Sequence, residues 1–146
     1  MATTTAQITL TSNDLTSDAL SLTTTATLTD TGSKVGVTET SGLSRKITTA
    51  TDEYTLLAEA DYADDKAHKV YIRNTSSSKE YFFYVAYNAS AAAATTAETI
   101  GKLYGQDWML MPYDGNVNIT VASSTASETQ YLEYMVFADG IVEAKG

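Results

Sequence analysis

The chain has no cysteine, one histidine and one proline among its 146 residues. Disulfides and thiolate metal sites are therefore excluded, and most zinc sites are excluded as well, because they draw on cysteine and histidine. No run approaches the ~20 consecutive apolar residues that a membrane-spanning helix needs. The scarcity of these residues therefore argues against a thiolate or zinc site, and the apolar runs predict no membrane span.

Basic residues are also scarce, with 9 lysines and arginines against 18 acidic residues and a net charge of −9. This charge repels a phosphate backbone, so we expect no nucleic-acid partner. Residues 1–6 contain neither the basic nor the apolar region of a signal peptide. We expect them to remain on the chain as a short flexible arm.

Hydroxyl side chains are abundant, with 25 threonines and 13 serines making up about a quarter of the chain. Threonine suits a half-solvated sheet surface. In residues 20–29, Leu20, Leu22, Ala26 and Leu28 share one parity, and serine and threonine fill the other. This period of two predicts a strand with one hydroxyl-covered face in water and one apolar face on a core.

Other short alternating or apolar runs are separated by Gly, Asp, Asn and Ser clusters. They span residues 7–11, 35–37, 43–49, 54–57, 69–73, 81–87, 108–113, 116–121 and 131–137. About eight to ten short strands at this spacing predict an all-β fold, an antiparallel β-sandwich or a jelly-roll-like barrel. We expect one domain over residues 7–138, followed by a tail at 139–146. The continuous run 81–87 is typical of a strand covered on both faces.

Residues 52–65 contain six carboxylates, which would suit a calcium site or a glycosidase acid/base pair. They are Asp52, Glu53, Glu59, Asp61, Asp64 and Asp65. The alternating Asp/Asn pattern of a calcium loop is missing, so a solvated loop is favoured. His68 is the only histidine available for a catalytic triad, but the sequence has no Gly-x-Ser-x-Gly nucleophile elbow, which favours a surface histidine. We therefore predict no catalytic, cofactor-binding or metal-binding residues and no enzyme activity.

The aromatic residues, 10 Tyr, 3 Phe and 1 Trp, are expected mainly in the core. A partner surface would also favour Tyr and Trp, and so would a sugar platform. The candidate partner interface consists of Tyr104, Trp108 and Tyr113. Tyr104 and Tyr113 flank glycine-containing turns, so we expect both to be exposed.

Three sets of residues carry a resemblance to a known family. They are the alternating residues 20–29; the strand Val70-Tyr71-Ile72-Arg73-Asn74 followed by the run 81–87; and Ile100-Gly101-x-Leu103-x-Gly105 with Met111-Pro112, Asp114-Gly115 and Tyr131-Leu132-Glu133-Tyr134. With these, the chain resembles the small structural virion proteins of tailed bacteriophages, especially those of marine cyanobacterial phages.

The resemblance implies a compact antiparallel β-domain with no catalytic residues. It implies a capsid decoration (cement) protein on the virion surface, which binds the major capsid protein or other virion proteins and bridges neighbouring capsid subunits. A trimer or dimer of the chain is expected with it. A tail, connector or fibre component, or a carbohydrate-binding module for host attachment, remains an alternative. A hydrolase that uses the acids of residues 52–65 ranks last.

Overall fold

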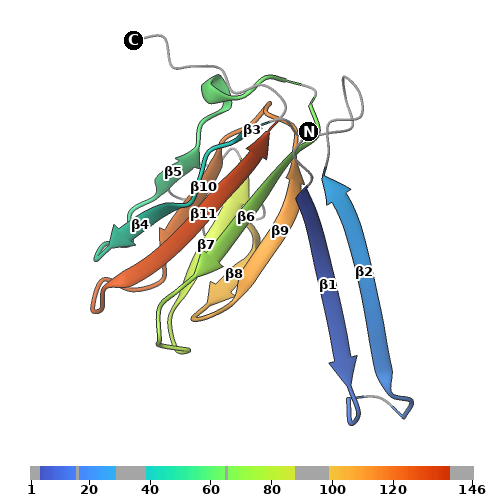
Figure 1. Ribbon diagram of the computed structural model, residues 1–146. Coiled ribbons are helices and arrows are strands. Elements are labelled where there is room, and N and C mark those ends of the chain that lie inside the picture. The colour runs from blue at the N-terminus through green and yellow to red at the C-terminus, as the bar shows by residue number, and fades with distance from the viewer. Residues whose placement is uncertain (1–3, 16, 29–38, 65, 88–98, 139–146) are drawn as a thin grey trace.

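The computed structural model describes residues 4–15, 17–28, 39–64, 66–87 and 99–138 (Figure 1). In them it has eleven β-strands, one short 3-10 turn and no α-helix. The first strands are β1 (Thr4–Ser12), β2 (Leu20–Leu28), β3 (Glu39–Thr40), β4 (Ser44–Thr48) and β5 (Tyr54–Leu57), and the 3-10 turn is η1 (Glu59–Asp61). The others are β6 (His68–Asn74), β7 (Phe82–Tyr87), β8 (Thr99–Tyr104), β9 (Trp108–Tyr113), β10 (Ile119–Ser123) and β11 (Gln130–Ala138). The described part holds no helix with the length and apolarity to cross a bilayer.

The strands from β4 to β11 form a sandwich of two antiparallel sheets. One sheet has the order β4-β11-β6-β9, and the other has the order β5-β10-β7-β8. Each connection along the chain passes from one sheet to the other, except that β7 and β8 pair within one sheet. This is the strand order of a jelly roll. The predicted all-β sandwich is confirmed, but the two sheets do not close into a barrel.

The short strand β3 continues the edge that β4 forms against β11. Between them, the Ser41 backbone N–H donates to the carbonyl oxygen of Val136 over 3.0 Å, and the Val136 N–H donates to Ser41 Oγ over 2.9 Å. These two bonds satisfy the backbone where the ladder is interrupted, so β11 is paired along most of that side.

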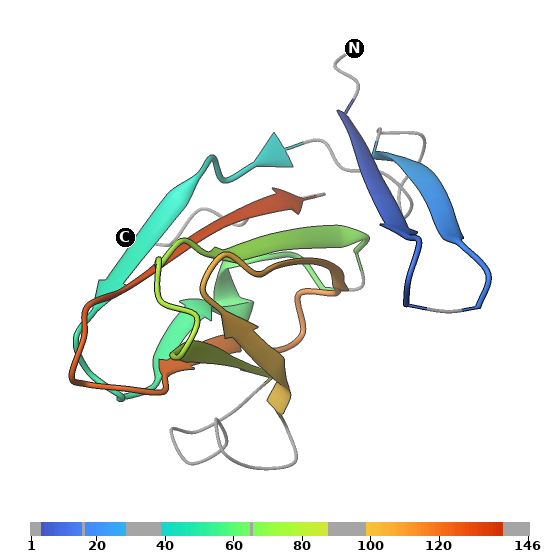
Figure 2. The same ribbon diagram turned by 90° about the horizontal axis from the view of Figure 1, so that it is seen from below.

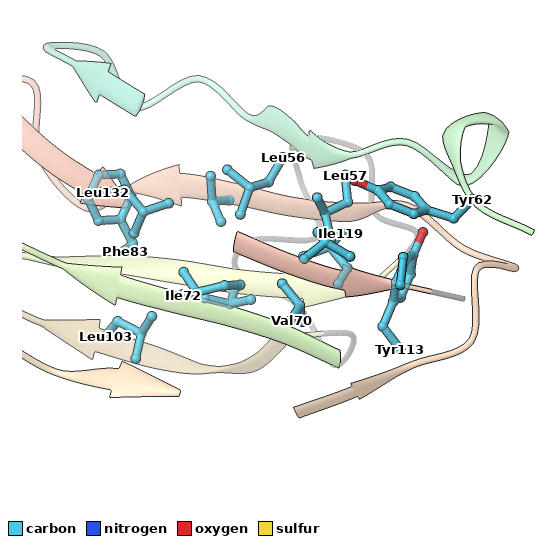
Figure 3. Close-up of a cluster of buried hydrophobic side chains, with 14 residues drawn as sticks. Leu56, Leu57, Tyr62, Val70, Ile72, Phe83, Leu103, Tyr113, Ile119 and Leu132 are labelled. Carbon is cyan, nitrogen blue, oxygen red and sulfur yellow. The ribbon is translucent and has the colours of Figure 1, made fainter. Parts of the chain in front are cut away.

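The hydrophobic core fills the space between the two sheets (Figure 3). Alternation decides which residues enter it, because successive strand side chains point to opposite faces. In β6, Val70 and Ile72 are fully buried, while Lys69, Tyr71 and Arg73 are only partly buried. In β7, Phe83 and Val85 enter the core, and Phe82 and Tyr84 lie on the outer face. The expectation that the run 81–87 is covered on both faces is therefore wrong at Phe82 and Tyr84, whereas Ala86, on the same face, is buried.

Strands β1 and β2 form a separate hairpin that belongs to neither sheet of the sandwich (Figure 2). No residue of either strand is buried. The expected strand in residues 20–29 exists, but the prediction that its apolar face lies on a core of this chain is wrong. Residues 4–6 also pair with 26–28, so the expected flexible arm 1–6 is wrong for them. The remainder of that arm, the strand at 35–37 and the tail 139–146 lie outside the described residues.

Candidate interaction surfaces

The three aromatic residues of the predicted interface lie in three different places. Tyr104 ends β8 and is 38% exposed on the outer face of the β5-β10-β7-β8 sheet, where its ring packs 4.9 Å from that of Phe82. Trp108 begins β9 and is 51% exposed on the opposite sheet. Tyr113 is 3% exposed and lies in the core. The structure therefore does not bring the three together, and the expectation that Tyr113 is exposed is wrong.

Tyr113 belongs to a buried aromatic cluster with Tyr62 and His68 at one end of the core. The ring of Tyr62 lies 5.6 Å from that of Tyr113 and 5.7 Å from that of His68, edge to face in both contacts. The Tyr113 hydroxyl donates to the carbonyl oxygen of Val117 over 2.8 Å, and His68 Nε2 lies 2.8 Å from the carbonyl oxygen of Ala63. His68 is fully buried, so the surface histidine expected from the sequence is wrong. A polar tip with a backbone partner explains how Tyr113 and His68 enter the core.

The outer face of the β4-β11-β6-β9 sheet forms a broad surface that no described strand covers, and we call it the aromatic face. Strand parity places twelve side chains on it, and none of them is buried. They are Arg45, Ile47, Lys69, Tyr71, Arg73, Trp108, Leu110, Pro112, Tyr131, Glu133, Met135 and Phe137. Ile47, Trp108 and Tyr131 are the most exposed of its large apolar side chains, at 58%, 51% and 44%. Aromatic residues, Met and Arg are the types enriched in protein interfaces.

A row of side chains crosses this face from strand to strand, because Arg45 pairs with Glu133, Glu133 with Arg73, and Arg73 with Trp108. Arg73 Nη1 lies 3.8 Å from Glu133 Oε1, and the Tyr71 hydroxyl donates to the same carboxylate oxygen over 3.2 Å. Burial raises the pKa of Tyr71, and the negative charge of Glu133 raises it further. The neutral phenol therefore remains a donor to Glu133 and helps to hold its carboxylate in place.

The turn between β8 and β9 holds Arg73 and Trp108 in position. Gln106, in the left-handed conformation at φ 75°, accepts from Arg73 Nη2 over 2.9 Å and donates to the carbonyl oxygens of Thr75 and Ser76. Asn74, fully buried at the end of β6, donates through Nδ2 to the carbonyl oxygen of Leu103 over 2.9 Å. The Asn74 backbone also exchanges hydrogen bonds with this turn. Rigid support of this kind lowers the entropy that binding costs.

Two shallow hollows mark the aromatic face. One, of about 500 Å³, is lined by Tyr71, Arg73, Gln106 and Trp108. The other, of about 320 Å³, is lined by residues of β4 and β11 with Thr75, and includes Ile47 and Tyr131. Both are open toward solvent, so they suit a protruding side chain or a sugar ring better than an enclosed small molecule.

The β1–β2 hairpin presents a second surface, which is exposed as far as the described residues extend. Cross-strand pairing puts most of its hydroxyl side chains on one face, where Gln7 Nε2 donates to Thr25 Oγ1 over 3.3 Å and the Thr9 and Thr23 hydroxyls lie 3.4 Å apart. Thr4, Ser12 and Thr24 lie on the other face. The opposite face carries seven apolar side chains. They are Ala6, Ile8, Leu10, Leu20, Leu22, Ala26 and Leu28.

The carboxylates of residues 52–65 do not gather into a site within the part of the chain that is described, where no group of three or more His, Asp or Glu side chains is placed to hold a metal ion. Burial raises the pKa of Glu53. Sequence reasoning missed Arg73, Glu133 and Tyr131 as members of a common surface. The only available signal was the parity of 69–73 and 131–137, and the sequence does not say that these two strands are neighbours.

Comparison with known proteins identifies no relative: no family model matches the chain, and neither a curated protein nor a solved structure matches it.

Proposed function

We propose that this protein is a non-enzymatic virion structural protein, a capsid decoration protein that docks on the outer shell and bridges neighbouring capsid subunits. The observation that carries the proposal is the aromatic face: a four-stranded sheet surface of interface-type side chains that no described strand covers. The jelly-roll order adds support, since viral capsid and lectin domains use this architecture. Fold alone does not assign function, so the proposal depends on the surface.

The charge distribution favours one orientation for docking. The aromatic face carries three basic side chains, Arg45, Lys69 and Arg73, and one acidic side chain, Glu133, so its formal charge is +2. The whole chain is −9. The negative charge therefore lies elsewhere and keeps free copies soluble, while this face approaches a neutral or acidic patch on a partner.

The size of the face indicates how it binds. Four strands spaced ~4.8 Å apart, each about six residues long, cover roughly 400 Å². A stable pairwise complex buries about 800 Å² per partner. One copy therefore binds weakly, and tight decoration needs several contacts made together on the symmetric shell.

Shell binding tests this proposal. Purified protein should co-sediment with assembled shells of the cognate phage and raise the temperature at which they disrupt. Trp108→Ala and Tyr131→Ala should each weaken binding about tenfold or more, because truncating a central interface aromatic costs about 2 kcal/mol. Tyr104→Ala, which removes a 38% exposed ring from the opposite sheet, should bind normally. Failure of the unaltered protein to co-sediment contradicts the proposal.

A tail, connector or fibre role is the nearest alternative, and copy number separates it from decoration. Hundreds of copies per particle indicate the shell, whereas a dozen or fewer indicate the tail. The hollow beside Trp108 favours one further candidate, carbohydrate binding, because a half-exposed indole lies next to the hydrogen-bonding groups of Arg73 and Gln106. Quenching of Trp108 fluorescence by oligosaccharides, abolished in Arg73→Ala, would identify that activity.

A further inference from the structure

The β1–β2 hairpin is an amphipathic ribbon whose apolar face has no cover among the described residues of its own chain. Leu10, Leu20 and Leu22 are 50%, 37% and 45% exposed. A two-stranded hairpin is marginally stable at best in water unless its apolar face is packed. We therefore infer that the apolar face of the ribbon packs against another molecule.

The chemistry of the ribbon favours a second copy of the same chain as that molecule. Two chains of net charge −9 repel each other. The strands Thr4–Ser12 and Leu20–Leu28 contain no charged residue, so they can meet without bringing like charges into contact. The same absence of charge gives the ribbon nothing with which to select a charged partner.

The order of side-chain sizes along the apolar face sets the geometry of this contact. The cross-strand rows run Thr4–Leu28, Ala6–Ala26, Ile8–Thr24, Leu10–Leu22 and Ser12–Leu20. On one side of the central Ile8–Thr24 row lies a notch of two alanines, and on the other side lies a ridge of two leucines. The notch and the ridge lie at equal distances from the central row.

We propose that two copies pair through this face, apolar side to apolar side, about a two-fold axis that crosses both strands at the Ile8–Thr24 row. This axis places the Leu10–Leu22 ridge of each copy over the Ala6–Ala26 notch of the other. A two-fold axis parallel to the strands would put notch on notch and ridge on ridge, leaving a void at one row and overcrowding the other. Close packing of large against small side chains selects the first arrangement.

The ribbon is small, so the pairing is weak in dilute solution. Nine-residue strands are about 30 Å long, and a two-stranded ribbon about 10 Å wide offers roughly 300 Å² per copy. That is well below the ~800 Å² per partner of a stable dimer. The inference does not rest on the proposed function, but a weak dimer of this kind would link two aromatic faces and make shell binding bivalent.

Single-cysteine cross-linking tests the two-fold axis, because the natural chain has no cysteine. Thr24 lies on the axis, so Thr24→Cys protein at high concentration should be joined into a dimer by a short bismaleimide. Thr4→Cys should not, because the two Thr4 positions lie about 27 Å apart at 3.4 Å per residue. A mixture of Thr4→Cys and Ser12→Cys chains should cross-link, since those positions face each other. Cross-linking of Thr4→Cys alone, or no cross-linking of Thr24→Cys, overturns the geometry.

Analytical ultracentrifugation of the full chain tests whether the partner is a second copy. The unaltered protein should show a concentration-dependent dimer, lost in Leu22→Asp and kept in Ser21→Asp, which places the same charge on the hydroxyl face. A trimer, or a monomer at every concentration, overturns the proposal. If Leu22→Asp abolishes shell binding while the unaltered protein is monomeric, the ribbon docks on the shell instead, and only this inference fails. If dimerisation occurs without shell binding, only the proposed function fails.

Discussion

At the scale of single residues, substitutions should be least tolerated where one backbone segment closely approaches another. Gly105 precedes the β8–β9 turn, and a Cβ atom there would lie 2.7 Å from the carbonyl oxygen of Ser76 and closer still to that of Ser78. These are main-chain atoms, which cannot rotate away. At Gly101, four residues earlier on β8, no atom of the described residues lies within 4 Å of the same position.

Gly105→Ala should therefore lower the free energy of unfolding by about 3 kcal/mol, the upper part of the usual cost of overpacking. Because the turn carries Gln106, the substitution should also weaken any binding through Trp108. Gly101→Ala is the matched control and should be neutral. Urea denaturation of the two variants measures the difference, and equal stabilities would contradict the close approach.

The buried tyrosines predict how stability depends on pH. Burial, followed by the charge of Asp61, raises the pKa of Tyr62 from its ordinary 10.0 to about 12. Burial, with neighbouring Tyr62, raises the pKa of Tyr113 further. A raised pKa in the folded state means that this stabilisation is complete below about pH 10, where unfolded tyrosine begins to ionise, and is lost as pH rises toward 12.

The urea midpoint should thus be level from neutral pH to about pH 10 and should fall steeply above it. The urea midpoint of the double variant Tyr62→Phe/Tyr113→Phe should fall less steeply with pH. It should be lower at neutral pH, because the Val117 carbonyl oxygen loses its donor. Lys69, whose pKa is lowered by burial, opposes the trend, but it is one group against five tyrosines with raised pKa values. An unchanged slope in the double variant would contradict the assignment.

At the scale of elements, the hairpin and the sandwich should differ in local stability. Strands β6 and β11 are each paired on both sides and supply fully buried side chains such as Ile72 and Val136. Strands β1 and β2 pair only with each other and bury no residue. Opening the hairpin therefore exposes little and costs little free energy.

In hydrogen–deuterium exchange at low protein concentration, amides of residues 4–12 and 20–28 should exchange orders of magnitude faster than those of β6 and β11. Raising the concentration should slow the hairpin alone, because pairing of its apolar face protects it. Hairpin amides as protected as those of β6 in dilute solution would contradict this account.

The elements also show which parts of the fold could be predicted from the sequence. Alternating or apolar runs predicted the strands now seen as β1, β2, β4 to β7 and β9 to β11, and their number predicted a sandwich. The same alternation in residues 20–28 misplaced the hairpin, because a period of two says that one face needs a cover and not which molecule provides it. His68 and Tyr113 were misplaced for a related reason: their exposure depends on carbonyl partners at Ala63 and Val117, which only the fold brings within reach.

The aromatic face could not be predicted from the sequence. Tyr71 and Glu133 are 62 residues apart in the chain and meet only because β11 pairs with β6. Tyr104 and Trp108 are four residues apart, yet the turn between them carries the chain from one sheet to the other. Nearness in sequence therefore grouped the wrong aromatic residues.

For the whole molecule, we propose that the aromatic face and the apolar face of the hairpin are contacts with other subunits. The aromatic face suits the shell, and the hairpin suits a second copy. Each surface alone is too small for a tight complex, so the proposed role requires both to act through repetition on a symmetric particle.

Electron cryomicroscopy of the intact particle tests this claim most directly. The account predicts many symmetry-related copies over the shell, with Trp108 and Tyr131 against a capsid subunit. Copies confined to a single vertex, or an aromatic face turned to solvent in every copy, would contradict it.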